Sequence, residues 1–300
     1  MLTFYFIFIS ALEPKYPVPL DCEDILKDNP NAGSGVYKIY PVGLTLPISV
    51  YCEMAINDGG WTVLQKHYSN EVSFTRTNTE FINGFGDLSG NFWLGLEYMH
   101  ILTDFATTKL VYDAMFVFED RYGEKKEQIY YDFRIGDSAS KYSISYDNDE
   151  TNGPNVAGDG LWNGALFYPT LTTDSTFVCL TNQPNGWWFP SNSTQYYHCG
   201  GSNLNNPVGT NSYGQGMYWE PWKGKYESLK SSTIMIRRNK NVPKPQTCDD
   251  LYNPSSPYHA STSWYWIFPF GMKPIYVPCW MESGNSWTVI FHYFLVSCIF

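Results

Sequence analysis

The chain has 300 residues, enough for one large domain with additional segments. It carries 29 Asp and Glu against 19 Lys and Arg, a net charge of −10, which excludes nucleic acid and anionic membrane surfaces as favoured partners. Aromatic residues make up 18% of the chain and charged residues 16%. Because Tyr and Trp combine an apolar ring with a polar group, this balance suits an extracellular binding surface.

The chain begins with an apolar run. Residues 1–12 are mostly Phe, Ile, Leu and Tyr, and Glu13 and Pro14 follow them. The run is similar to the core of a signal peptide, although no basic residue precedes it. A buried strand is the alternative. We assign residues 1–17 to a signal peptide and a short lead, and we expect a secreted, extracellular protein.

The cysteines are widely spaced. The chain has no Cys-x-x-Cys pair and only five histidines, so a zinc cluster is not expected. Wide spacing in an acidic, aromatic chain favours disulfides in an oxidising compartment. The seven cysteines are Cys22, Cys52, Cys179, Cys199, Cys248, Cys279 and Cys298. Asn192 heads an Asn-Ser-Thr triplet in a turn-rich stretch and is a candidate for N-glycosylation.

The N-terminal part of the chain is expected to form a small sheet. Asp21 is a candidate cap for a short helix over 22–26. Alternating residues and a hairpin signal at 58–60 predict three strands, over 36–40, 48–52 and 61–65. A Cys22–Cys52 disulfide would close a loop of about thirty residues and stabilise the fold by about 3–4 kcal/mol.

The central part mixes short helices and strands with loops. The residue pattern predicts a helix over 96–102 and β-structure over 109–118, 128–135, 142–146 and 228–237. The acidic and Gly-rich residues 147–164 are expected to form a long loop. The fold class is therefore α+β, and loops of this length are usually functional.

The stretch 179–224 is rich in Gly, Asn and aromatic residues. Because Gly and Asn are poor helix formers and common turn residues, the stretch predicts irregular loops. A crosslink would hold their large flat side chains in place. We expect a recognition surface in this stretch.

A series of short motifs runs through residues 21–230. They are Asp21-Cys22, Ser34–Tyr37, Val50–Met54, Asp58–Gln65, Asn83–Gly86, Phe92–Gly95, Gly158-Asp159, Trp187-Trp188, Asn203–Asn205, Gly216-x-x-Trp219, Trp222–Gly224 and Ser228–Lys230. In type and order the series resembles the fibrinogen C-terminal-like domain family, which includes fibrinogen chains, ficolins, tachylectins, tenascins and angiopoietins. The resemblance covers 22–238 and implies a domain over 18–239.

The resemblance implies a particular architecture. We expect an N-terminal subdomain with a small antiparallel sheet, a larger central sheet subdomain and a loop-rich C-terminal binding subdomain. The family pattern also implies two disulfides, Cys22–Cys52 and Cys179–Cys199.

Family members place a calcium ion in the loop before the second disulfide, through an Asp-x-Asp pattern. The corresponding stretch here, 167–179, has a single carboxylate at Asp174. Since calcium takes six to eight oxygen ligands, one carboxylate indicates a degraded site, and a turn capped by Asp174 is the alternative. The acidic segment 147–150 is a further place for an ion, although an exposed loop is the favoured interpretation.

Acetyl-binding members of the family have an aromatic pocket beside the second disulfide. Tyr213 and Gly214 match its Tyr-small step, and Tyr226 lies near its last aromatic residue. Gln183 and Gly200 replace a Tyr and a His of the pocket. Two further residues are candidate ligand contacts, namely His198, on the other side of Cys199, and Trp188. We expect Trp187, Trp219 and Trp222 to be core or loop-packing residues.

The C-terminal tail repeats the N-terminal part. Residues 248–252, 275–281 and 286–290 echo 22–26, 48–54 and 60–64. We interpret 240–247 as a linker and 248–300 as a truncated second copy of the N-terminal subdomain, in which Cys248 and Cys279 correspond to the first disulfide. Cys298 has no partner inside either unit and is a candidate for pairing between chains. The apolar end 287–300 is short for a membrane span, so a strand is expected there.

These observations support a secreted recognition module that binds a carbohydrate or an acetylated group near residues 183–226. The alternative is a matrix or signalling ligand that contacts an extracellular protein receptor without sugar or calcium. An enzyme is not expected, because the chain has none of the hydrolase, metalloprotease or phosphate-loop motifs.

Overall fold

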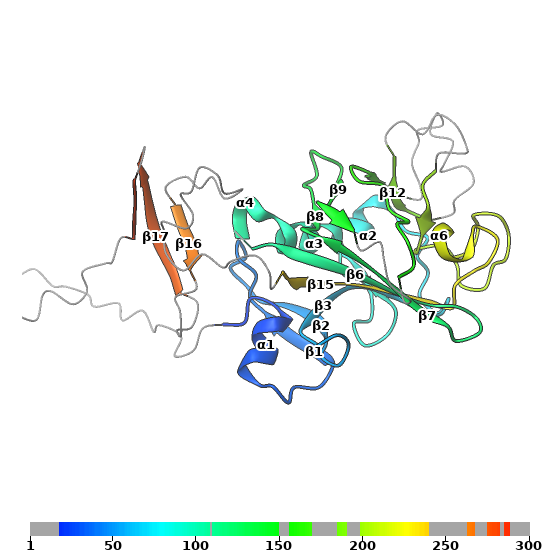
Figure 1. Ribbon diagram of the computed structural model, residues 1–300, viewed down its shortest axis with the longest axis horizontal. Coiled ribbons are helices and arrows are strands. Elements are labelled where there is room, and N and C mark those ends of the chain that lie inside the picture. The colour runs from blue at the N-terminus through cyan, green and yellow to red at the C-terminus, as the bar shows by residue number, and fades with distance from the viewer. Residues whose placement is uncertain are drawn as a thin grey trace, which may run out of the picture. The chain divides into compact units, whose positions relative to one another are not determined.

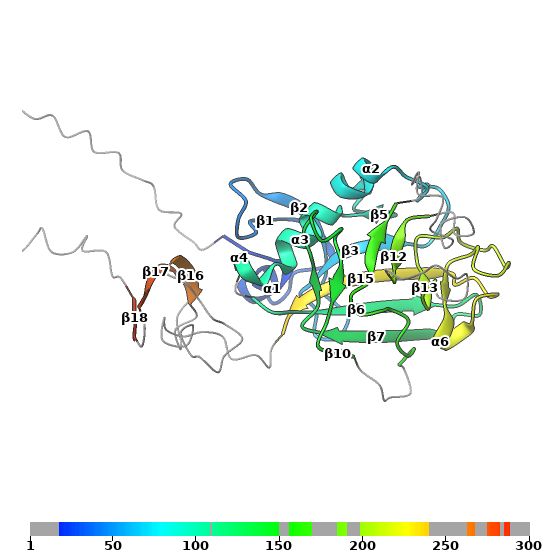
Figure 2. The ribbon, with the colours of Figure 1, turned by 90° about the horizontal axis from the view of Figure 1, so that it is seen from above.

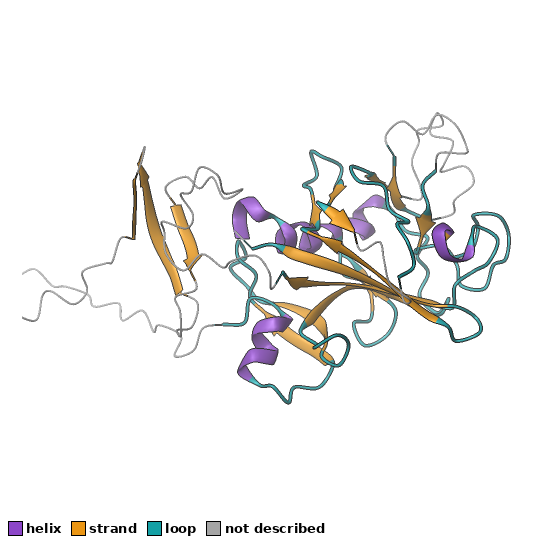
Figure 3. Ribbon diagram, in the orientation of Figure 1, coloured by secondary structure: helices purple, strands orange, loops and turns teal. Residues whose placement is uncertain are grey.

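The computed structural model describes residues 18–108, 110–149, 156–169, 185–190 and 199–239, together with the backbone of three strands between 263 and 288. The chain divides into two compact units. One is Pro19–Lys244, and the other combines Met1–Val18 with Pro245–Phe300. Figures 1 and 3 show that strands and loops dominate the first unit and that its helices are short.

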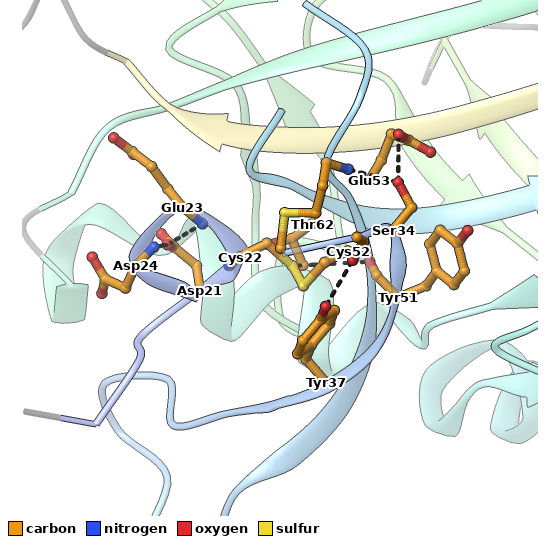
Figure 4. Close-up of a disulfide and its surroundings, with 12 residues drawn as sticks. Asp21, Cys22, Glu23, Asp24, Ser34, Tyr37, Tyr51, Cys52, Glu53 and Thr62 are labelled. Carbon is orange, nitrogen blue, oxygen red and sulfur yellow. Dashed lines mark hydrogen bonds between the residues drawn. A yellow bond between two sulfur atoms is a disulfide. The ribbon is translucent and has the colours of Figure 1, made fainter. Parts of the chain in front are cut away.

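The N-terminal subdomain contains one helix and three antiparallel strands. Helix α1 (Cys22–Asp28) begins after Asp21, whose side chain accepts hydrogen bonds from two backbone amides of the first turn. Strands β1 (Gly35–Ile39), β2 (Ile48–Glu53) and β3 (Trp61–His67) pair in chain order. The Cys22–Cys52 disulfide joins α1 to β2 with a Cα–Cα distance of 5.5 Å (Figure 4).

Within the described residues, nine strands form the main sheet. Its order is β1-β2-β3-β15-β6-β7-β10, and β5 (Phe92–Trp93) pairs with both β3 and β4 (Phe85–Gly86). The strands not yet given are β6 (Tyr112–Glu119), β7 (Lys125–Tyr131), β10 (Asn148–Asp149) and β15 (Ser231–Arg238). Figure 2 shows β15 lying between β3 and β6, so the last strand of this unit occupies the middle of the sheet.

Short helices and hairpins pack around the sheet. Helix α2 (Asn78–Asn83) begins with a capping box formed by Thr77 and Glu80. Helix α3 (Leu96–Thr103) buries Leu96, Met99 and Leu102, and α4 (Phe105–Thr108) follows it. The α+β prediction is confirmed.

Two local predictions are wrong. The strand expected over 128–135 is interrupted, because Asp132 adopts a left-handed backbone (φ 50°) that ends β7 and directs the chain into β8 (Arg134–Ile135). β8 pairs with β9 (Ile144–Ser145) instead of extending the main sheet. In addition, the start of the expected loop 147–164 forms β10, which pairs with Tyr130 and Tyr131 of β7.

A buried ionic cluster joins the two ends of the first unit. The Arg238 guanidinium, at the end of β15, lies 2.8 Å from Asp21 Oδ1 and 3.1 Å from Glu23 Oε2, and it also pairs with Asp24. The side chains of Arg238 and Asp21 are each only 2% exposed. Burial raises the pKa of the Asp21 carboxyl, while the guanidinium acts in the opposite direction. Tyr112 donates a hydrogen bond to Asp21 Oδ2 at 2.8 Å.

The second unit contains three antiparallel strands in its described part. These are β16 (Ser263–Ile267), β17 (Ile275–Glu282) and β18 (Asn285–Thr288). The predicted signal peptide 1–17 and the linker 240–247 lie outside the described residues, as do Cys248 and Cys298. Across the described ranges, no helix combines the length and the apolar character that crossing a membrane requires.

We predict that Arg238→Met lowers the free energy of unfolding by about 3–5 kcal/mol, because it leaves buried carboxylates without their counter-charge. Chemical denaturation of the purified protein measures this change. Lys27→Met is the matched control, since Lys27 lies 2.7 Å from Glu23 but is 48% exposed, and we expect a change below about 1 kcal/mol. Equal effects of the two substitutions would contradict the structural role of Arg238.

Candidate functional site

Short strands organise the loops after residue 165. β11 (Leu166–Tyr168) pairs with β12 (Trp187–Phe189), and β13 (Ser202–Asn203) pairs with β14 (Tyr218–Trp219). Helix α6 (Glu220–Lys223) follows β14 directly. We call the described residues 185–190 and 199–228 the aromatic loop region.

Three of its tryptophans belong to the core. Trp187 and Trp219 are fully buried, and Trp219 donates its indole N–H to the Gly158 carbonyl at 2.7 Å. Trp188 is 4% exposed, donates to the Tyr142 carbonyl at 2.8 Å and packs on Trp93. The prediction that Trp188 contacts a ligand therefore needs correction, because its ring faces are covered by the core. Trp222 is half-buried, as expected for a loop-packing residue.

Buried asparagines connect the segments of the aromatic loop region. Asn185 donates from Nδ2 to the Asn205 carbonyl, and Asn203 donates back to the Asn185 carbonyl at 3.1 Å. Asn205 donates to the Gly186 carbonyl at 2.8 Å. All three side chains are at most 2% exposed. The sequence indicated only that these residues favour turns. It did not predict that their side chains connect the loops by hydrogen bonds.

Strand β3 of the main sheet also contacts the aromatic loop region, at Leu204. Gln65 Nε2 donates to the Leu204 carbonyl at 3.1 Å, and His67 Nδ1 lies 3.0 Å from that oxygen. The imidazole of His67 is 1% exposed and stacks on Phe74 with ring centroids 4.0 Å apart. Burial lowers the pKa of His67 to about 4, so the ring is neutral at physiological pH.

Helix α6 is fixed to the β6–β7 turn by an ion pair. Lys223 Nζ lies 2.8 Å from Asp120 Oδ2, which is almost fully buried, and 2.9 Å from Glu124 Oε2. The hydrogen bonds that the Lys223 ammonium donates to these carboxylates raise its pKa. The ammonium also lies 4.7 Å from the ring centroid of Trp222. The Trp-Lys-Gly motif thus positions the helix that precedes Lys225 and Tyr226.

The structure brings Tyr213, Gly214 and Tyr226 together, with Lys225 beside them. The rings of Tyr213 and Tyr226 meet edge to face at 5.1 Å, and Lys225 Nζ lies 5.9 Å from the Tyr213 centroid. Gly214 N donates to the Lys225 carbonyl at 2.8 Å, and Gly214 has a φ of 65°, which favours glycine. Tyr226 is 69% exposed. We call Tyr213, Lys225 and Tyr226 the tyrosine surface.

The remaining predicted site residues lie outside the described residues. They are the candidate ligand contacts Gln183 and His198, the calcium candidate Asp174, the sequon residue Asn192, and Cys179. Cys199, which lies within the described residues, is disulfide-bonded. Within the described ranges, no group of three or more His, Cys, Asp or Glu side chains is placed to hold a metal ion.

Comparisons with known proteins agree on one relationship. The family model for the C-terminal globular domain of fibrinogen beta and gamma chains matches residues 18–239. Microfibril-associated glycoprotein 4 of Bos taurus is 35% identical over 233 residues, which cover 74% of this chain and 86% of that protein. Angiopoietin-4 of Mus musculus is 31% identical over 235 residues, which cover 76% of this chain and 43% of that protein. The fibrinogen-like globe domain of human ANGPTL2 superposes with a TM-score of 0.64 and 31% identity over 74% of this chain and 99% of that one.

We predict that the destabilisation caused by His67→Asn depends on pH. The pKa of His67 is about 4 in the folded state and about 6.5 in the unfolded state, so the unfolded chain binds more protons between these values. His67 therefore contributes stability that rises with pH over this range. Urea denaturation should show a loss that is larger at pH 7 than at pH 4.5 by about 2–3 kcal/mol.

The matched control is Asp113→Asn. Burial raises the pKa of Asp113 to about 6, so its carboxylate destabilises the fold as pH rises. As pH rises to 7, the free energy of unfolding of Asp113→Asn should increase relative to that of the parent protein. The free energy of unfolding of His67→Asn should decrease relative to it. A pH-independent effect of His67→Asn would show that the imidazole is not held neutral by burial.

Proposed function

Because this chain belongs to the fibrinogen C-terminal domain family, we propose that it is an extracellular recognition module that binds a matrix or signalling protein through the tyrosine surface. One observation carries the proposal. Tyr226 is 69% exposed although its ring is held against Tyr213, so a large aromatic side chain is presented to solvent in a fixed position. Tyrosines of this kind are enriched among the residues that dominate protein–protein binding.

The support beneath the tyrosine surface favours tight binding. Asn206 donates from Nδ2 to the carbonyls of Gly214 and Gly216 at 2.8 and 3.2 Å, so the turn after Tyr213 is fixed from the buried side. Lys225 has a side chain only 8% exposed and pairs with Glu220 at 3.2 Å. Since these groups are ordered before binding, little side-chain entropy is lost when a partner docks.

The relatives support an extracellular partner. The chain aligns with most of a protein named for its association with microfibrils, and with part of an angiopoietin. The Cys22–Cys52 disulfide and the disulfide of Cys199 suit an oxidising, extracellular setting. Binding at this surface requires no catalytic group, and we expect no enzymatic activity.

A glycan or acetylated ligand is the second candidate. It is favoured by the meeting of Tyr213, Gly214 and Tyr226, the residues that match the acetyl-binding pattern. Two observations make it the weaker candidate. Trp188 is buried, and the Tyr213 ring is already contacted by Tyr226 and Lys225, so an added sugar ring would compete with these contacts.

We predict that Tyr226→Ala weakens binding to a matrix or signalling protein about 10- to 100-fold, the range of an interface hot spot. Surface plasmon resonance of the secreted protein against recombinant microfibril and receptor ectodomains measures this change. Leu46→Ala is the matched control, because Leu46 is 74% exposed but lies in the N-terminal subdomain. Both variants should melt like the parent protein, since both side chains are exposed.

Two results would decide against the proposal. Equal binding by the parent protein and Tyr226→Ala would exclude the tyrosine surface as the contact. Binding that is displaced by N-acetylglucosamine and abolished by Tyr213→Ala would instead select the glycan candidate.

A further inference from the structure

The turn between β6 and β7 presents a second exposed tyrosine. Asp120 Oδ1 accepts hydrogen bonds from the backbone amides of Tyr122 and Glu124, each at 2.8 Å. The Gly123 amide donates to the Asp120 carbonyl at 3.1 Å, and Gly123 has a φ of 87°, which favours glycine. Since Asp120 is almost fully buried, these bonds fix the turn from its inner side. The Tyr122 side chain at the tip of the turn is 73% exposed.

An ion pair joins this turn to the segment that carries Tyr226. Arg121 Nε lies 3.8 Å from Glu227 Oε1. Arg121 immediately precedes Tyr122, and Glu227 immediately follows Tyr226, so the ion pair places the two tyrosines on adjoining segments. Figure 2 shows α6, the helix before Tyr226, beside the end of the main sheet at which β7 begins. Among the described aromatic side chains, Tyr122 and Tyr226 are the most exposed.

Arg121 contacts both Glu227 and the Tyr122 ring. Its guanidinium carbon lies 4.7 Å from the ring centroid, and Nη2 donates a hydrogen bond to the Tyr122 hydroxyl. The Arg121 side chain is 50% exposed, whereas that of Glu227 is 25% exposed. The cation is therefore more accessible to a partner than its own carboxylate is. A guanidinium that stacks on an aromatic ring presents N–H donors along its edge, and these match the geometry of a carboxylate.

Among the described residues, the ion pairs around this turn contain five cations and four carboxylates, although the whole chain has a net charge of −10. The carboxylates are the less exposed members. Only Glu124 is more than one-quarter exposed, and it pairs with two lysines. The surface of the turn is therefore positive in an acidic protein. The cations are Arg121, Lys125, Lys126, Lys223 and Lys230, and the carboxylates are Glu119, Asp120, Glu124 and Glu227.

We propose that the partner bound at the tyrosine surface also contacts Tyr122 and Arg121, and that it presents an aspartate or glutamate side chain to Arg121. This inference rests on the proposed function and extends the contact surface to the β6–β7 turn. Tyr and Arg are two of the residue types enriched among binding hot spots. Because the turn is fixed from its inner side, its two side chains lose little freedom when a partner docks.

A protein segment fits this surface better than a sulfated polysaccharide does. A sulfated polysaccharide is negative along its whole length, so it would meet Glu124 and Glu227 as well as the cations, and like charges repel each other. A protein segment can place one carboxylate at Arg121 and apolar groups against the rings of Tyr122 and Tyr226. The net charge of −10 also disfavours an extended polyanion.

Peptide selection tests the proposal without a known partner. A random peptide library displayed on phage is selected on the full secreted chain, and peptides that bind Tyr226→Ala less well are retained. We predict that the retained peptides are enriched in Asp and Glu next to apolar residues. Tyr122→Ala should weaken their binding about 5- to 30-fold, and Arg121→Glu about 10- to 100-fold, as measured by surface plasmon resonance.

Lys38→Glu is the matched control for Arg121→Glu. Lys38 is exposed on β1 in the N-terminal subdomain, and its substitution makes the same change of charge, so peptide binding should change less than about twofold. A retained peptide whose acidic residue is changed to lysine should bind the parent protein weakly and regain affinity for Arg121→Glu. Since exposed ion pairs contribute little stability, the variants should melt like the parent protein.

Four results would decide against the inference. Unchanged binding of the retained peptides to Tyr122→Ala and Arg121→Glu would overturn it and leave the tyrosine surface in place. Retained peptides rich in Lys or Arg would overturn it as well. Heparin binding that is lost in Arg121→Glu, with no enrichment of acidic peptides, would select a sulfated polysaccharide instead. If no selected peptide depends on Tyr226, the tyrosine surface itself is wrong and both proposals fail.

Discussion

The buried guanidinium of Arg238 is the constraint on which the first unit depends. It joins the last residue of β15 to the first turn of α1, and both partners are removed from solvent. Asp21 accepts hydrogen bonds from two helical amides and from the Tyr112 hydroxyl in addition to pairing with Arg238. The disulfide begins at the next residue, Cys22. A covalent link and an ionic link therefore fix the helix at adjacent positions.

The aromatic loop region is ordered by a different kind of interaction. Its strands are only two or three residues long, so side-chain amides take over part of the role of a sheet ladder. The side-chain amides of Asn185, Asn203 and Asn205 each donate a hydrogen bond to a backbone carbonyl of a neighbouring loop segment. Because this network is buried and contacts Gln65 and His67, the loops that carry the half-buried Tyr213 and the exposed Tyr226 are anchored to the main sheet.

Local patterns were sufficient to predict much of the N-terminal subdomain. The alternation in 48–52 corresponds to β2, in which every second residue is buried, and the hairpin signal before Trp61 leads into β3, which is buried on both faces. The position of β15 was not predictable in this way, since its neighbours β3 and β6 are far away in the chain and no local signal selects them. The break at Asp132 depends on one left-handed residue that the strand-like composition around it conceals.

In the candidate site, too, some features were predictable from the sequence and others depend on distant segments. Family resemblance placed Tyr213, Gly214 and Tyr226 in one cluster, and they do lie together. It did not distinguish an exposed Trp188 from a buried one, because burial is decided by Trp93 and Phe167 from distant segments. Nothing in the sequence distinguishes Gln65 and His67 from other strand residues. In the structure, loops cover β3, so both side chains are buried and contact the Leu204 carbonyl.

The central place of β15 has a consequence for biosynthesis. A nascent chain that has emerged only as far as β14 has both β3 and β6 complete but nothing to insert between them. Two long strand edges then remain open until Ser231–Arg238 leaves the ribosome, and open edges of this kind promote aggregation. The unit can therefore complete its folding only after its own last strand has been synthesised. Shielding by a chaperone is of most value before the eight residues of β15 have left the ribosome.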